Sequence, residues 1–370
     1  NLRDTTLQPA HATIEIAQGG LGAELPQLTV DYTPVDSLIT IDGSGNLVVA
    51  DHVSDANNYT ITRSGGNYII TNPGVVMGTV IAGSSGSGTA TVTIPAAAFA
   101  GSIIFNGGGG DDTLTVDLSG GNFTPSITFN GGTQSGATGD TLVVTGGTFA
   151  SGTLNHTNAT DGSVVLGSNT INYTGLEPVD VTGTTVTDLV INLPDNALTG
   201  DDTELSIAAG NLVVTSLNGT HELDIIALAG FTTVTVNARL GDDKITLDST
   251  MSTFNKVLTL NGGVGSDKFV FEASVAAPGT ITVNGGAGTD SLDYSAYKVA
   301  AVDTSVNVSL SATAANGFSG EVKAGGSTIT SFTEIDAVTG NSTATADTIT
   351  GLNAASAWTI DESTTSKYVS

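Results

Sequence analysis

Apolar and polar residues alternate in short runs along most of the chain. Clear examples stand at 38–41, 46–49, 59–62 and 68–71, where every second residue is apolar. This period of two is typical of a half-buried β-strand, because successive side chains of a strand point to opposite faces. Apolar stripes with the period of a helix are hard to find, and residues 95–100 would make one turn at most. The pattern therefore predicts an all-β protein.

One glycine turn returns at a nearly constant interval. The sequence Asn-Gly-Gly-Val-Gly-Ser-Asp at 261–267 has a similar copy at 284–290 and a degenerate copy at 237–243. Another copy stands at 106–112, and a copy that begins at 126–132 is interrupted by an insertion. An insertion within a turn lengthens a corner without disturbing strands, which repeat proteins tolerate.

This interval predicts a parallel β-helix with about 23–24 residues per coil. In such a β-solenoid each coil stacks on the previous one at the usual strand spacing of roughly 4.8 Å. Inward-facing Val, Ile, Leu and Phe would fill the interior, and Thr, Ser, Asp and Lys would face water. Tandem β-sandwiches are the alternative, since their short strands also recur at regular intervals. The repeated turn favours the β-helix, because sandwich hairpins have no reason to repeat one turn.

We expect three segments along the chain. Residues 1–35 hold two alternating runs without the glycine turn and would form a cap, or an arm that adds a strand to a neighbouring molecule. Residues 36–179 would form a first solenoid module, and residues 180–370 a second module with most of the glycine turns. The sequence Gly-Asn-Leu-Val-Val, present at 45–49 and again at 210–214, suggests two related modules.

The charge balance limits the partners. The chain has 36 acidic and 9 basic residues among 370, a net charge of -27, although only 12% of its residues are charged. This charge repels nucleic acid and anionic lipid and favours cations. No apolar run is long enough to predict insertion into a membrane, and the absence of cysteine does not decide the compartment. A start at Asn1 without a leader suggests a processed or trimmed chain.

The glycine turns resemble the calcium-binding nonapeptide of RTX (haemolysin-type) proteins. The pattern Gly-Gly-x-Gly-x-Asp-x-apolar-x fits at 107–115, 262–270 and 285–293. The resemblance implies Ca²⁺ bound by turn carbonyls and by aspartate carboxylates. By this resemblance the metal ligands would be Asp112, Asp267 and Asp290, with Asp243 and Asp140 as degenerate members.

The spacing departs from that family. RTX proteins place two nonapeptides back to back in each coil, whereas here a single turn occurs in each longer coil. Calcium would then lie between stacked turns along one corner, in a column through Asp243, Asp267 and Asp290. The alternative is that each aspartate accepts hydrogen bonds from the amides of its own turn and that the preceding asparagines form a side-chain ladder.

The wider sequence is similar to haemagglutinin-like β-helical proteins of bacterial surfaces. The similar segments are 171–179, 291–297, 306–310, 332–340 and 347–351. The resemblance implies an extracellular or cell-surface structural protein, part of a layer, fibre or adhesin, with surface glycans as possible targets. Exposed sheet edges at the coil ends would favour head-to-tail self-association.

Catalysis is not expected. His11, His52, His156 and His221 lie far apart in sequence and belong to no nucleophile motif, so they are interpreted as surface or loop residues. Nine basic residues do not easily build a cleft for an acidic polysaccharide. Because pectinase-like enzymes share the β-helix, a polysaccharide-degrading or glycan-binding module stays the alternative function.

Overall fold

The computed structural model describes residues 35–53, 55–134, 136, 139–195, 198–273, 281–341, 343 and 347–352, together with the backbone of two strands at 12–15 and 27–30. The described chain consists of strands, turns and four short 3-10 helices, so the predicted all-β class is confirmed. No helix in these ranges is long and apolar enough to cross a membrane. The 3-10 helices are η1 (Ala96–Ala98), η2 (Leu118–Gly120), η3 (Leu228–Gly230) and η4 (Ser249–Thr253).

One mixed sheet of 27 strands contains nearly all of the described strands. Its pairings follow two rows of strands, which we name the first and second ladders. In order of pairing, the first ladder contains β7 (Met77–Thr79), β3 (Ser37–Ile41), β4 (Leu47–Asp51), β9 (Ile103–Gly109), β11 (Ile127–Thr133), β14 (Asn169–Thr174), β13 (Gly162–Leu166), the later parts of β12 (Asp140–His156) and β15 (Leu176–Asn192), β19 (Thr233–Leu240), β21 (Val257–Val264), β23 (Ile281–Ala287), β29 (Ser327–Ile335), β28 (Phe318–Ala324), β27 (Val306–Thr313) and β31 (Thr348–Thr350).

The second ladder shares two strands with the first. β12 and β15 contain 17 residues each, and their earlier parts belong to the second ladder. In order of pairing, this ladder contains β8 (Thr91–Pro95), β6 (Asn67–Thr71), β5 (Asn58–Ser64), β10 (Thr113–Asp117), β12, β15, β18 (Asp224–Ala227), β17 (Asn211–Ser216), β16 (Asp202–Ala208), β20 (Lys244–Leu247), β22 (Lys268–Phe271), β24 (Ser291–Asp293) and β30 (Ala337–Thr339).

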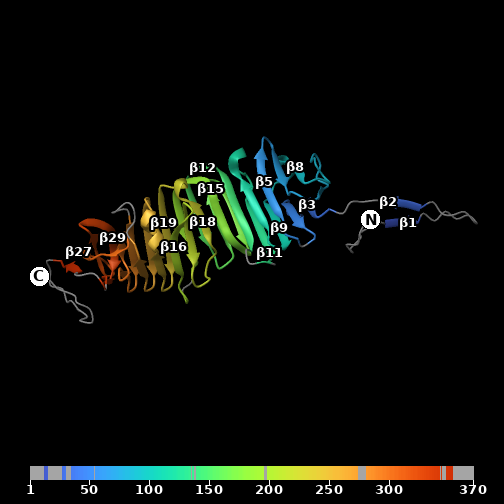
Figure 1. Cartoon of the computed structure of the whole chain (residues 1–370). Coiled ribbons are helices and arrows are strands. Elements are labelled where there is room, and N and C mark those ends of the chain that lie inside the picture. The colour runs from blue at the N-terminus through green and yellow to red at the C-terminus, as the bar shows by residue number, and fades with distance from the viewer. Residues whose placement is uncertain are drawn as a thin grey trace, which may run out of the picture.

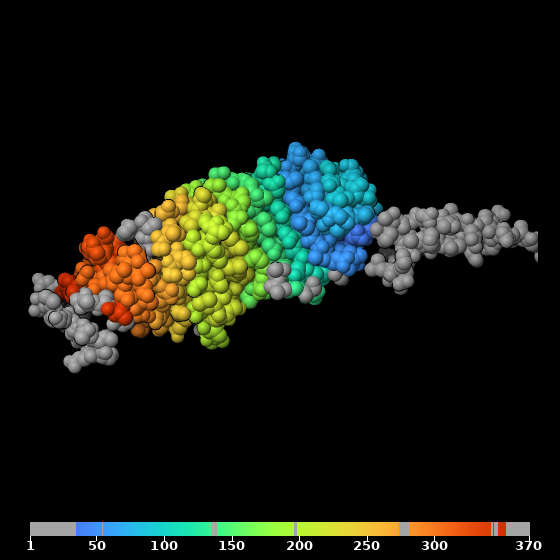
Figure 2. Space-filling view, in the orientation of Figure 1, coloured from blue at the N-terminus to red at the C-terminus, as the bar shows by residue number. Residues whose placement is uncertain are grey.

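The body formed by the ladders is elongated. Figure 1 shows the strands lying across its long axis, and the colours follow one another from the blue end to the red end. Figure 2 shows the same succession as bands on the surface. Segments close in sequence are therefore neighbours along the axis. We name one passage of the chain through a first-ladder strand and a second-ladder strand a circuit.

The predicted spacing appears where successive strands are parallel. Thr233 pairs with Val257, and Asn261 pairs with Asn284. In the second ladder Lys244 pairs with Lys268. Each pair joins equivalent positions of two successive glycine-turn copies. The glycine turns thus stack in register, and the interval read from the sequence is correct for this stretch.

Elsewhere antiparallel hairpins enlarge the interval. Thr128 pairs with Asn172, and Asp188 pairs with Thr233, so the intervals there are nearly twice as long. The hairpins β13–β14 and β16–β17 occupy places in the sheet between strands of successive circuits. The predicted parallel β-helix was therefore wrong in this respect, because the sheet also contains antiparallel hairpins. Tight turns such as Ala209-Gly210, where both φ angles are positive, fold the chain back on itself.

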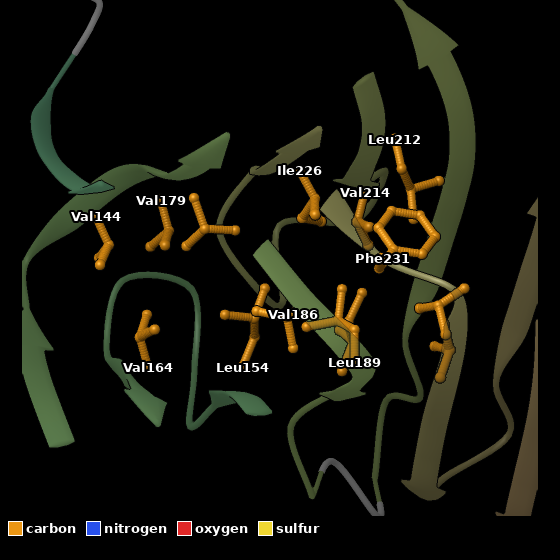
Figure 3. Packing of buried hydrophobic residues seen from close by; sticks show 14 of the residues in the cluster. Val144, Leu154, Val164, Val179, Val186, Leu189, Leu212, Val214, Ile226 and Phe231 are labelled. Carbon is orange, nitrogen blue, oxygen red and sulfur yellow. The ribbon is translucent and has the colours of Figure 1, made fainter. Parts of the chain in front are cut away.

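The interior is apolar and follows the predicted alternation. In β10 the buried residues are Leu114 and Val116, and the residues between them are partly exposed. Figure 3 shows buried side chains facing one another across the interior, with Val144 and Val179 on one side and Val164 and Leu154 on the other. Each such side chain contributes about 1.5–3 kcal/mol when it leaves water.

Two expected boundaries can be located. The boundary near residue 180 lies within β15, which pairs with β12 on one side and with β18 and β19 on the other, so the sheet continues across it. Of the proposed N-terminal arm or cap, the structure describes only β1 (Ala12–Glu15) and β2 (Gln27–Val30), which pair with each other in a separate two-stranded sheet.

Candidate functional site: an aspartate column and a buried histidine cluster

The five predicted aspartates occupy one corner of the body. Each stands at or immediately before the first residue of a second-ladder strand, directly after the glycine turn that ends a first-ladder strand. These five residues are at most 2% exposed. The structure also places Asp201 and Asp336 at this corner. We name this set the aspartate column: Asp112, Asp140, Asp201, Asp243, Asp267, Asp290 and Asp336.

Hydrogen bonds run from one aspartate to the next along the column. The backbone N–H of Asp243 donates to Oδ1 of Asp267 at 2.9 Å, and the N–H of Asp267 donates to Oδ1 of Asp290 at 2.8 Å. The N–H groups of Asp201 and Asp290 donate in the same way to the next aspartate, at 2.6 and 2.8 Å. Nearer the N-terminus, Asp112 N–H donates to Asp140 at 2.7 Å. Each carboxylate therefore links two successive circuits.

The glycines of the turn make room for these carboxylates. A Cβ on Gly262 would overlap Oδ2 of Asp267 and the carbonyl oxygen of Gly285. Gly263 has a φ of +114°, and a Cβ there would overlap the carbonyl oxygen of Arg239 in the preceding circuit. The two adjacent glycines are thus required for different reasons, the first by the carboxylate and the second by the backbone.

Burial raises the pKa values of the aspartates in the column. Desolvation raises the pKa of Asp243 to about 7 and the pKa values of Asp112 and Asp267 to about 6, and neighbouring aspartates add to the rise. Desolvation also raises the pKa of Asp140 and Asp290. The backbone N–H donors oppose this by favouring the charged form. The folded column thus holds protons more tightly than the unfolded chain does.

An asparagine ladder accompanies the column on the first-ladder strands. Nδ2 of Asn261 donates to Oδ1 of Asn237 at 2.7 Å, Asn237 donates to Asn192 at 2.7 Å, and Asn192 donates to Asn155 at 2.8 Å. This is the side-chain ladder that the alternative interpretation of the turns predicted. The other half of that interpretation was wrong, since these carboxylates accept hydrogen bonds from the turn of the preceding circuit rather than from their own.

Oδ2 of each of the five predicted aspartates is buried and accepts no hydrogen bond, so it is the atom that a calcium ion would have to reach. Calcium takes six to eight oxygen ligands that converge on one point. In the column Oδ1 of Asp267 already accepts a backbone N–H, and its Oδ2 faces the Gly262 backbone. Within the described residues, no three His, Asp or Glu side chains lie where they could hold one metal ion. Calcium binding therefore stays a prediction from the family resemblance.

The column is interrupted in the middle of the body. Asp140 pairs with Leu176, a buried apolar residue, so the next circuit has no carboxylate at that position. The register of the asparagine ladder aligns Asn155 with Asn192 and Asn237, and so places His156 where the glycine turns have their first glycine. At this interruption His156, with its imidazole side chain, stands where the regular turns have a glycine.

His156 lies between two buried carboxylates. Its Nε2 is 2.9 Å from Oδ2 of Asp224, and its Nδ1 is 3.1 Å from Oε2 of Glu222. His221 packs beside it with ring centroids 5.1 Å apart and bonds to the hydroxyl of Thr203 at 3.0 Å. All four ionisable residues are at most 4% exposed. We name His156, His221, Glu222 and Asp224 the histidine cluster.

The pKa values of the two histidines are shifted in opposite directions. Burial alone would lower the pKa of His156, but Asp224 and Glu222 outweigh it and raise that pKa to about 10. Burial and the neighbouring His156 lower the pKa of His221. His156 is therefore the cation of the cluster and His221 its neutral member, whose Nδ1 is 2.7 Å from the carbonyl oxygen of Glu222.

The interpretation as a surface or loop residue was wrong for His156, which is the buried last residue of β12; His221 does lie in a loop, between β17 and β18, but is buried. His52 is exposed as expected, and His11 lies outside the described residues. The signal in the sequence was Asn155-His156 after an alternating run, at the place where other runs end in Asn-Gly. The acidic partners stand much later in the chain, so only the register between circuits brings them together.

Comparison of the chain with protein-family models, with curated proteins and with solved structures found no match. The resemblances to RTX and haemagglutinin-like proteins thus rest on the quoted motifs alone.

Proposed function

We propose that the chain is a structural β-solenoid, a rod that forms part of an extracellular or cell-surface layer, fibre or adhesin. Its support is the way in which adjacent circuits are joined. Strands, asparagine side chains and buried carboxylates all form bonds parallel to the long axis, and the described ion pairs are few. These bonds resist extension and bending of the rod.

The aspartate column is the observation that carries the proposal. A typical intramolecular hydrogen bond contributes about 0.5–1.5 kcal/mol. Because the column repeats this bond from Asp201 to Asp336, opening one junction between circuits breaks one such bond. These hydrogen bonds are additional to those of the strand ladders, and they support the proposal of a stiff rod.

By the RTX resemblance, bound calcium would stiffen the rod. The hydrogen bonds of the aspartate column could stiffen it without an ion. For Ca²⁺ to bind, Oδ2 of each of the five predicted aspartates, which accepts no hydrogen bond, would have to turn from the backbone of the glycine turn toward the ion. Thermal unfolding with millimolar calcium and with excess chelator therefore separates an ion-stiffened rod from a hydrogen-bonded one.

Self-association through the coil ends is the remaining part of the proposal. The ladders end at short strands, β30 and β31 at one end and β7 and β8 at the other. Residues 85–89 already bridge to β7 and β8, so the edges proposed to pair with a second copy are those of β30 and β31. Electron microscopy and sedimentation over a concentration series test it. The proposal predicts filaments whose length grows with concentration, and single rods at the highest concentration would contradict it.

The polysaccharide-degrading alternative is tested directly. Incubation with acidic and neutral glycans, followed by an assay for reducing ends, should show no release if the chain is a structural rod. Release that depends on the folded protein would favour the enzyme. Immunolabelling of intact cells then tests the expected surface location.

A further inference from the structure

A surface pocket of about 300 Å³ lies at the N-terminal part of the body, away from the column. It opens where the β5–β6 hairpin meets the segments that precede β9 and β11. Its lining consists of Arg63, Tyr68, Ala96, Phe99, Ala100, Gly101, Thr124 and Pro125. This volume is at the lower end of ligand pockets, so the occupant would be small.

Arg63 stands at an inward-facing position of its strand. Tyr59 and Ile61, which precede it at alternate positions of β5, are fully buried, and alternate residues of a strand share a face. Arg63 also pairs directly with Tyr68, which is 2% exposed. The guanidinium therefore continues the core side of the hairpin and reaches the pocket instead of extending from the solvent face.

The charge of Arg63 has no acidic partner in the described part of the chain. Its Nη1 donates to the carbonyl oxygen of Asn122 at 2.6 Å, which fixes the side chain on one side. The other described arginine, Arg239, lies 3.4 Å from Asp195. An unmatched guanidinium is unusual in a chain with 36 acidic and 9 basic residues, and its remaining N–H groups can hold a carboxylate in a two-pronged contact.

Aromatic rings form the apolar side of the pocket. Tyr68 stacks on Phe123 with centroids 5.4 Å apart and packs against Phe99 at 5.7 Å. Phe99 is partly exposed and lines the pocket. A flat apolar body beside one anionic group matches this lining.

We propose that this pocket binds a small monocarboxylate with a flat apolar body, of the aromatic carboxylic acid class. Its carboxylate contacts the Arg63 guanidinium, and its ring lies against Phe99. A polyanionic chain is disfavoured, because the net charge of -27 repels many charges more strongly than one. The proposal is independent of the rod function and stands or fails separately.

Ligand-detected NMR titration with benzoate tests the site, with benzamide as the neutral molecule of the same shape. We expect saturable binding of benzoate, binding of benzamide weaker by about tenfold or more, and a similar loss for Arg63→Gln with benzoate. Arg239→Gln is the matched control and should bind benzoate as the unmodified protein does.

Absence of saturable benzoate binding would overturn the proposal, and so would equal binding of benzamide and benzoate. If Arg63→Gln does not fold, the comparison of the two ligands on the unmodified protein decides. A folded Arg63→Gln protein with unchanged affinity for benzoate would also overturn it.

Discussion

The regular stretch from β19 to β24 and the middle of the body around β12, β15 and β18 occupy the same corner with different chemistry. In the regular stretch a glycine faces an aspartate, which accepts a backbone N–H from the preceding circuit. In the middle His156 takes the place of the glycine and faces Glu222 and Asp224. Both regions therefore hold buried carboxylates at this corner, with a backbone N–H as the partner in one region and an imidazolium in the other.

The buried carboxylates of the two regions also depend on different partners. An aspartate of the column relies on one backbone N–H, which is present whatever the side chain of the donor residue. The carboxylates of the histidine cluster rely on one side chain. The middle of the body should therefore be the more sensitive of the two regions to a single substitution.

The largest effect is expected from His156→Ala. The substitution leaves Glu222 and Asp224 buried without their cation, and breaking a buried ion pair costs about 3–5 kcal/mol. Denaturant unfolding would measure it, with His52→Ala, at an exposed histidine, as the control. A loss no larger than that of the control would show that the cluster does not stabilise the fold.

Gly262→Ala should cost about 1–3 kcal/mol, because the added methyl group overlaps the Asp267 carboxylate and the Gly285 carbonyl oxygen. Gly66→Ala is the matched control, since a Cβ at Gly66 meets no atom. Equal stability of the two variants in denaturant unfolding would contradict the close packing of glycine and carboxylate.

Stability should fall as the pH rises. The pKa values of Asp112, Asp243 and Asp267 are raised from the ordinary 3.8 to about 6–7, so the folded state binds the extra protons and their contribution is lost as pH rises through these values. His156, with a pKa of about 10, extends the loss to alkaline pH.

We expect the free energy of unfolding to fall from about pH 4, near the ordinary aspartate pKa, to about pH 7, where the raised carboxylates have ionised. Denaturant titrations at several pH values would measure this slope, and Asp243→Asn should reduce it. A free energy of unfolding that rises over the same range would contradict the raised pKa values.

The smallest effect is a gain of about 0.5–1 kcal/mol for Arg239→Gly. Arg239 has a φ of +80° at the place where the next circuit has Gly263, so glycine relieves backbone strain. Its exposed pair with Asp195 is worth little. Arg239→Ala loses the same pair but keeps a Cβ, so thermal unfolding should show no gain for it.

The regular stretch could be predicted from sequence because one turn contains the whole pattern. The Asn-Gly-Gly turn and its aspartate are local, and the constant spacing of the copies aligns them without further information. The five expected aspartates do share one corner. The direction of their bonds, to the preceding circuit, depends on the stacking and could not be read from one turn.

The middle of the body could not be predicted in this way. The hairpins β13–β14 and β16–β17 nearly double the interval, and their alternating sequences are equally suited to parallel and antiparallel pairing. His156 meets Glu222 only because β15 and β18 bring their circuits into register. Without that register, separated histidines are ordinary surface residues.

The stabilities of Asp267→Asn and Asp267→Ala, with calcium and with chelator, test the central claim that the column is held by hydrogen bonds. Asparagine keeps an oxygen that can accept the Asp243 N–H and carries no buried charge, so this variant should be at least as stable as the unmodified protein near pH 8. Alanine should lose about 1–3 kcal/mol, in calcium and chelator alike. Strong stabilisation of the unmodified protein by calcium, lost in Asp267→Asn, would contradict the claim.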